Sequence, residues 1–124
     1  MNADALKQGR AAMTARDFGA AEKIARGAIA QAPDSQGYEL LANALRAQER
    51  LEEALTAAER AVSLDETNAS AQHGRAFILS RLGQFADALA IYDQLIAGGM
   101  AHPSLSLNRS VALLGLTRDA DAKA

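Results

Sequence analysis

The sequence contains no cysteine, no tryptophan, two prolines, and only three Phe and two Tyr as aromatic residues among its 124 positions. Without cysteine, disulfides, thiolate catalysis and thiolate metal sites are all excluded. No run of roughly 18 apolar residues occurs, and the amino terminus has no signal-peptide pattern. A net charge of −2 provides no basic field for a phosphate backbone, so nucleic acid is not an expected partner. We expect one soluble, cytoplasmic domain without a membrane partner.

Alanine, by contrast, is abundant and recurs at regular intervals. The stretch 16–35 aligns with 49–68 at a shift of 33 residues, and 49–68 aligns with 83–102 at a further shift of 34. Abundant alanine favours helix. The aligned columns are Phe18, Leu51 and Phe85; Ala21, Ala54 and Ala88; Ala25, Ala58 and Tyr92; and Ala28, Ala61 and Leu95. A helical unit is therefore repeated along the chain.

The segments before these stretches align at the same shifts. They contain a column of small residues and a second column three residues later: Gly9, Ala42, Ala76 and Ser110, then Ala12, Leu45, Leu79 and Leu113. Small residues let helices approach closely, so each unit is predicted to be two helices joined by a short turn. We expect helices at about 3–14, 17–31, 35–47, 51–64, 69–81, 84–97 and 104–115, with an eighth beginning near 118. Asp34 or Ser35 is expected to cap the third helix, and Thr67 or Asn68 the fifth.

A period of about 34 residues, paired helices and small residues at these offsets resemble the tetratricopeptide repeat (TPR) family. The resemblance covers a single domain, 1–124, with repeats at about 2–34, 35–68 and 69–102 and a partial repeat at 103–124. The family's usual tryptophan is absent, and its closing proline is kept at Pro33 but replaced by Glu66 and Met100. The resemblance implies an all-α, right-handed superhelical solenoid of antiparallel helix pairs, whose concave wall is lined by the first helix of each unit.

Family members generally bind a segment of another protein along that concave wall and are not themselves catalysts. Helical geometry places the following residues there: Leu6, Arg10, Met13, Leu40, Asn43, Arg46, His73, Phe77, Asn108 and Val111. This face offers a protein or peptide client both hydrogen-bonding and apolar side chains. Two other interpretations stay open. Phe77 and Val111 could pack between adjacent first helices, and Arg10 and Arg46 could be solvated charges paired with Glu39.

One TPR subgroup grips the free carboxylate end of chaperone tails with lysines, asparagines and an arginine. Asn43 falls near one of those positions in this chain. Leu6, Ser70 and Gly74 occupy others, where basic or amide groups are required. A clamp of that kind is therefore not expected here.

No residue pattern typical of an active site or a cofactor site occurs. His73 and His102 lie far apart in sequence without an acidic pair at metal-ligand spacing, so no metal site is expected. His73 is expected to be a hydrogen-bonding residue of the groove, and His102 to mark a helix start. Gly98 and Gly99 lack the following lysine of a phosphate loop and indicate a helix end. We expect no cofactor and no enzyme activity from these residues alone.

The fourth unit is short, and its leucines have only a helix fragment to cover them, whereas a solenoid needs a polar terminal cap. Because Met1 opens a unit naturally and Ala124 ends one abruptly, we expect the amino-terminal module of a longer protein. In some bacterial proteins, TPR segments precede a glycosyltransferase or sulfotransferase domain and recruit the protein to be modified, for example flagellin. The leading hypothesis is a protein-protein interaction module that recruits its client to such an effector. The alternative is a structural module that forms a homodimer through its uncapped carboxyl-terminal repeat.

Overall fold

Helices form the whole framework of the computed structural model, which describes residues 2–123 and the side chains of residues 3–122. No strand occurs within this range. The helices are α1 (Asn2–Thr14), α2 (Phe18–Gln31), α3 (Ser35–Ala47), α4 (Leu51–Leu64), α5 (Ala69–Arg81), α6 (Phe85–Ala97) and α7 (Leu105–Lys123). The bounds predicted for α1 to α6 are confirmed to within one residue.

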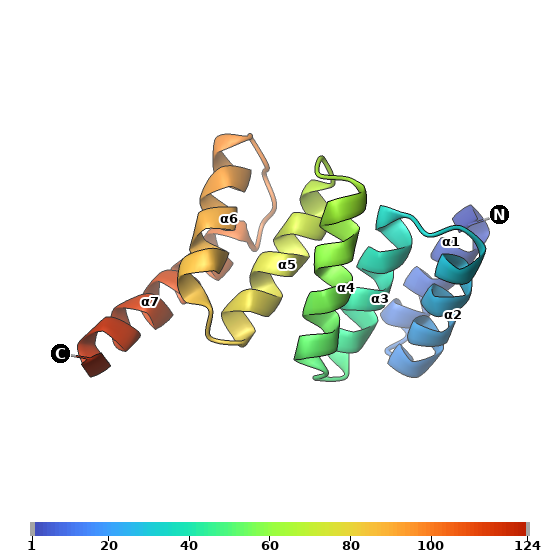
Figure 1. Ribbon diagram of the computed structural model, residues 1–124, viewed down its shortest axis with the longest axis horizontal. Coiled ribbons are helices and arrows are strands. Elements are labelled where there is room, and N and C mark those ends of the chain that lie inside the picture. The colour runs from blue at the N-terminus through green and yellow to red at the C-terminus, as the bar shows by residue number, and fades with distance from the viewer. Residues whose placement is uncertain (1, 124) are drawn as a thin grey trace.

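The helices are stacked as pairs along the long axis of the molecule (Figure 1). Within each pair α1 packs on α2, α3 on α4 and α5 on α6, and each second helix also contacts the first helix of the next unit. The first helices α1, α3, α5 and α7 contact one another in order, whereas the backbones of α2, α4 and α6 do not approach each other. The first helices therefore form one closely packed wall, and the second helices form a more open one.

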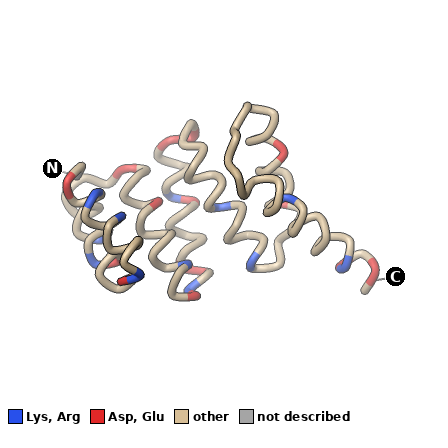
Figure 2. Tube along the Cα trace, turned by 180° about the vertical axis from the view of Figure 1, so that it is seen from behind, with Lys and Arg blue, Asp and Glu red and all other residues tan. Residues whose placement is uncertain are grey.

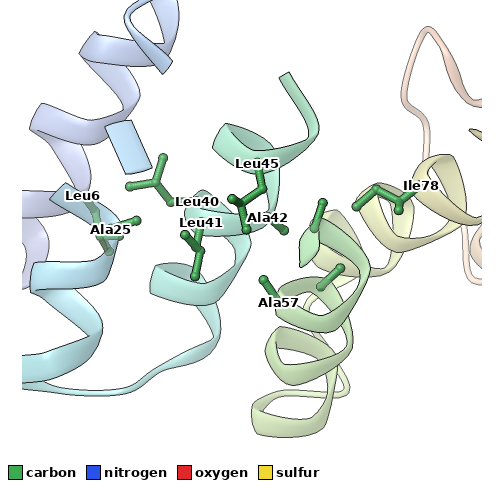
Figure 3. Packing of buried hydrophobic residues seen from close by; sticks show 10 residues of the cluster. Leu6, Ala25, Leu40, Leu41, Ala42, Leu45, Ala57 and Ile78 are labelled. Carbon is green, nitrogen blue, oxygen red and sulfur yellow. The ribbon is translucent and has the colours of Figure 1, made fainter. Parts of the chain in front are cut away.

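The alanines lie where the helices meet. Ala21, Ala25, Ala54 and Ala88 are all fully buried, and leucines of neighbouring units fill the remaining space in one core cluster (Figure 3). At Gly9 an added Cβ would overlap the side chain of Leu40. Small residues thus let the units approach, as the repeated columns predicted, and the larger side chains occupy what is left.

The turn inside each unit has the same backbone conformation. Arg16 and Glu49 have φ values of 61°, and Gly83, the equivalent residue of the third unit, has a φ of 84°. Only glycine adopts this left-handed conformation without steric cost. In each turn the next backbone N–H donates to a carbonyl oxygen five residues back, for example from Gln84 to Leu79 at 2.9 Å. One residue with positive φ therefore reverses the chain in all three units.

The prediction of an eighth helix is wrong, because α7 continues without interruption to Lys123. The residue equivalent to Gly83 in this unit is Thr117, and a β-branched residue strongly disfavours a positive φ. Its hydroxyl instead donates to the carbonyl oxygen of Leu113 at 3.0 Å, within the helix. No second helix folds back on α7 in the described residues. Ser110 is consequently exposed, unlike the other members of its small-residue column.

The predicted helix caps are present at two starts. Asp34 accepts a hydrogen bond from the Gly37 backbone N–H at 2.8 Å, and Asn68 accepts one from Ala71 at 3.1 Å. The Asn68 amide also donates to the Ser35 hydroxyl, which itself donates to the carbonyl oxygen of Ala61. The α5 cap is thus tied to both helices of the preceding unit. None of the described helices is long and apolar enough to cross a membrane.

Candidate functional site

Three adjoining hollows run along α1, α3, α5 and α7, and we call them together the first-helix groove. The first, of about 250 Å³, is lined by Arg10, Met13, Gln36, Glu39, Leu40, Asn43 and Arg46. The second, of about 330 Å³, is lined by Glu39, Asn43, Arg46, Ser70, His73, Gly74, Phe77, His102, Ser104 and Asn108. The third, of about 40 Å³, is lined by Phe77, Ser80, Arg81, Tyr92, Asn108 and Val111. Successive hollows share lining residues, so the groove is continuous across the units.

Nine of the ten predicted groove residues line this groove: Arg10, Met13, Leu40, Asn43, Arg46, His73, Phe77, Asn108 and Val111. The exception is Leu6, which is only 4% exposed and belongs to the core cluster. Placing Leu6 on the groove surface was therefore wrong, because α1 packs against α3 and encloses this position. Leu40 is buried too and forms part of the groove floor.

Arg46 lies where the first and second hollows meet. Its guanidinium carbon is 5.0 Å from the centre of the Phe77 ring, a cation–π contact. Its Nε is buried without a hydrogen-bond partner. Burial lowers the pKa of Arg46 from its ordinary value, and the charge of Arg81 adds to this effect. The charge of Glu49 partly offsets this lowering, but no ion pair joins Arg46 to an acidic side chain among residues 3–122.

The sequence left open a pairing of Arg10 and Arg46 with Glu39, and the structure does not contain it. One Glu39 carboxylate oxygen accepts a hydrogen bond from the Asn68 amide at 3.1 Å, and the other accepts one from the Ser70 hydroxyl at 2.6 Å. No ion pair joins Glu39 to either arginine among residues 3–122. Acidic and basic residues are otherwise spread along the whole solenoid (Figure 2).

His73 lies at the centre of the second hollow. Its Nε2 is 3.2 Å from the Asn108 side-chain nitrogen, so His73 makes a hydrogen bond within the groove. Its ring packs edge-on against Tyr92 and His102, with centroids 5.9 and 4.8 Å away. Burial, followed by the charges of His102 and Arg46, lowers the pKa of His73. The described residues contain no cluster of three or more His, Cys, Asp or Glu that could hold a metal ion.

His102 precedes α7, and its Nδ1 accepts a hydrogen bond from the backbone N–H of Ser104 at 3.2 Å. This confirms its predicted place at a helix start. Its contact with His73 was not predicted, because His102 lies in the connection between α6 and α7, outside the helical columns. The alignment of units contains no signal for how such a connection folds over the groove.

The carboxyl-terminal part of the groove combines the apolar side chains of Phe77 and Val111 with polar ones. Val111 is 52% exposed, so its side chain is not buried between adjacent first helices. Phe77 is half-buried and lies beneath Arg46. Leu107 and Leu114 of α7 are also exposed. The groove therefore changes from mainly polar side chains around Arg46 to a mixture of apolar and polar side chains near Val111.

Tyr92 reaches the third hollow from the second helix α6. Its side chain is 0% exposed, and its hydroxyl is buried without a hydrogen-bond partner among the described residues. Burial raises the pKa of Tyr92 to about 12. The sequence aligned this residue with Ala25 and Ala58, but it did not indicate that Tyr92 would line a hollow of the groove.

A separate hollow of about 630 Å³ lies on the second-helix side, with lining residues from α2, α3 and α4. Tyr38, Leu41 and Leu45 of α3 contribute apolar surface to it. Arg60 lies over Tyr38 at 5.9 Å from the ring centre, which resembles the arrangement of Arg46 and Phe77 in the groove. We call this region the second-helix hollow. It was not predicted, and it provides matched control positions for the groove.

Comparisons with known proteins agree with this geometry. Two family models described as tetratricopeptide repeat match residues 6–70 and 45–107. No curated protein sequence matches the chain. The TPR2B domain in the pHsp70 complex of yeast Sti1 is 22% identical, with a TM-score of 0.82 over 91% of this chain and 96% of that chain. The Sgt2 TPR domain from Aspergillus fumigatus is 18% identical, with a TM-score of 0.88 over 97% and 82% of the two chains.

The stacked helix pairs and the continuous groove define a superhelical repeat solenoid with an open binding wall. The chain belongs to the tetratricopeptide repeat family, because the first family model alone covers more than half of its residues. A TPR-like protein from Chlorobium tepidum has a similar extent. It is 19% identical, with a TM-score of 0.74 over 96% of this chain and 94% of that one. The predicted fold class and family are therefore confirmed.

Proposed function

We propose that this chain is a protein-protein interaction module that binds a peptide or protein client along the first-helix groove. The observation that carries the proposal is the continuity of the groove, which joins Arg46, whose Nε has no hydrogen-bond partner among the described residues, to an exposed apolar side chain at Val111. Fixed polar groups beside apolar surface are typical of sites that bind extended segments. The module is proposed to act by binding.

The likeness of fold supports this proposal. The TPR2B and TPR2AB domains of yeast Sti1 were solved as complexes with pHsp70 and pHSP90. The second is 23% identical, with a TM-score of 0.80 over 90% of this chain and 46% of that chain. The client of this chain need not resemble those partners, because Leu6, Ser70 and Gly74 stand where a chaperone-tail clamp needs basic or amide groups.

Random peptides displayed on phage and selected on the immobilised chain test the proposal. Selected peptides should compete with one another, and Asn43→Ala, Arg46→Ala and Phe77→Ala should each weaken binding, by about tenfold at the most important position. Fluorescence anisotropy measures the affinity, and thermal unfolding reports whether each variant remains folded. Thr56→Ala in the second-helix hollow is the control. Groove variants that bind the selected peptides as tightly as the original chain would contradict the proposal.

The finer part of the hypothesis concerns what the client is recruited to. By resemblance, the module is proposed to bring a protein substrate to an attached effector, such as a bacterial, cytoplasmic glycosyltransferase acting on flagellin. The described residues do not test this part. The measurement that does is glycosyl transfer by the full-length protein to the captured client, with and without the Arg46→Ala substitution.

A second candidate function is self-association through α7. Leu107, Leu113 and Leu114 are exposed on this helix, and grouped exposed leucines favour an interface. Sedimentation velocity across a wide concentration range tests it. A homodimer should dissociate on dilution and be weakened by Leu113→Asp, whereas a monomer at every concentration would rule it out.

A further inference from the structure

The third hollow of the groove contains a buried tyrosine whose hydroxyl is not explained by the proposed function. Tyr92 reaches it from α6, between residues of α5 and α7, with a side chain that is 0% exposed. The Tyr92 hydroxyl is buried and has no hydrogen-bond partner among the described residues. Buried polar groups are almost always paired. An unpaired hydroxyl beside a cavity in a groove therefore indicates a place for a ligand group.

The volume of the hollow limits what that group can be. At about 40 Å³ it exceeds the roughly 10–15 Å³ that a single water needs. It is far smaller than the pockets of roughly 300 Å³ or more that bind whole small molecules. A short side chain of a few heavy atoms fits this range. Phe77 and Val111 supply apolar walls, and the Ser80 hydroxyl and Asn108 amide supply polar ones.

The surroundings favour a neutral ligand over a charged one. Arg81 lines the hollow, but its guanidinium already forms an ion pair with Glu49 at 2.6 Å. Burial raises the pKa of Tyr92 to about 12, so its hydroxyl is protonated at neutral pH and can donate a hydrogen bond. A hydroxyl both donates and accepts a hydrogen bond and can therefore pair with Tyr92 in either direction. Threonine adds a methyl group that suits the apolar walls.

We propose that the third hollow is a specificity pocket that receives a threonine side chain of the client, with its hydroxyl paired to Tyr92 and its methyl between Phe77 and Val111. Serine fits the same pocket with less apolar contact. This inference rests on the proposed function, because the client must lie along the first-helix groove to reach the pocket. Aliphatic side chains without a hydroxyl leave Tyr92 unpaired and are bound less well.

The test uses peptides selected by phage display on the intact chain. Threonine should be enriched at one position, and replacing it with valine, which has nearly the same shape, should weaken binding by about 3–10-fold, the value of one net hydrogen bond. Tyr92→Phe should weaken binding of the threonine peptide by a similar factor. In a double-mutant cycle the valine peptide should bind Tyr92→Phe no worse than it binds the original chain, because both changes remove the same bond.

Thermal unfolding separates this role from a structural one. Tyr92→Phe removes a hydroxyl that has no partner, so its melting temperature should be unchanged or higher. Tyr38→Phe, in the second-helix hollow, is the matched control and should leave peptide binding unchanged. Val111→Phe gives an independent variant, because this exposed residue can be enlarged without disturbing the core and should narrow the pocket, so it should also reduce the preference for threonine.

The outcomes distinguish this inference from the proposed function. If no displayed peptide binds the groove, the proposed function itself fails. If peptides bind through Arg46 and Phe77 but threonine and valine peptides have equal affinity, only the pocket assignment is overturned, and the hollow holds water. The pocket assignment is also overturned if Tyr92→Phe lowers the melting temperature and weakens binding of both peptides equally, because Tyr92 would then have a structural role only.

Discussion

The first helices α3 and α7 occupy equivalent places in their units, but only α3 is covered. Leu45 of α3 is 2% exposed, whereas its equivalent in α7, Leu113, is 43% exposed. The difference arises because α4 packs closely on α3, while α7 continues past Thr117 with no helix folded back onto it. A leucine at this position is therefore a core residue only when a second helix covers it. Its place in the repeat alone does not determine whether the leucine is buried.

Truncating the two leucines tests this comparison, and it is expected to give the largest difference in the free energy of unfolding. Leu45→Ala should lower the free energy of unfolding by about 2–5 kcal/mol, because it leaves a cavity in a packed core. Leu113→Ala should change it by no more than about 0.5 kcal/mol, because water already reaches this side chain. Urea unfolding followed by circular dichroism measures both. A large loss for Leu113→Ala would break the comparison and show that α7 is covered in solution, in which case the loss should depend on protein concentration.

Enlarging an alanine should give the next largest effect. Ala54 is fully buried where α4 meets its neighbours, and its equivalent on α7, Ala122, is exposed. Ala54→Leu should cost about 1–3 kcal/mol of stability by overpacking the joint. Ala122→Leu and the exposed Ala69→Leu should be tolerated. Melting temperatures of the three variants test this order, and equal melting temperatures would mean that the joint can relax around a larger side chain.

The local features of the fold could be predicted from the sequence because they repeat. The columns that contain Gly9, Ala54 and Ala88 predicted the helices and the face that forms the groove. The predicted bounds of α1 to α6 agree with the structure to within one residue. The prediction of an eighth helix was wrong because it required Thr117 to adopt the positive φ that Gly83 has at the equivalent position. That signal was present in the sequence, because a β-branched residue at a turn position argues against a turn.

Other features could not be derived from the period. The carboxylate of Glu39 is satisfied by Asn68 and Ser70 instead of by an arginine, and this choice depends on side-chain rotamers and distances between units. The contact of His73 with His102 depends on how a connection lies over the groove. The free hydroxyl of Tyr92 depends on the depth to which α6 packs. Periodicity identifies the face on which a residue lies, and the partners on that face are set by tertiary packing.

The smallest effect on stability is expected from the polar side-chain interactions between units, which differ between the amino-terminal units and α7. Glu22 of α2 accepts hydrogen bonds from Gln48, Arg26 and Arg50, whereas the one ion pair that α7 makes among residues 3–122 joins Arg109 to Asp93 at 2.6 Å and is exposed. The hydrogen bond from Gln48, followed by those from the two arginines, lowers the pKa of Glu22 below its ordinary value. The unfolded chain therefore binds this proton more readily than the folded chain.

Because the folded-state pKa of Glu22 is depressed, its contribution is fully present above the ordinary glutamate pKa of about 4.3 and is lost as the pH falls through the folded-state value. Glu22→Gln should cost about 0.2–1 kcal/mol at neutral pH and flatten the loss of stability in acid. Urea midpoints measured from neutral pH down through this range test it. Glu59→Gln is the control, because this exposed side chain makes no ion pair among the described residues. An equal acid dependence in both variants would show that Glu22 does not tie the first two units together.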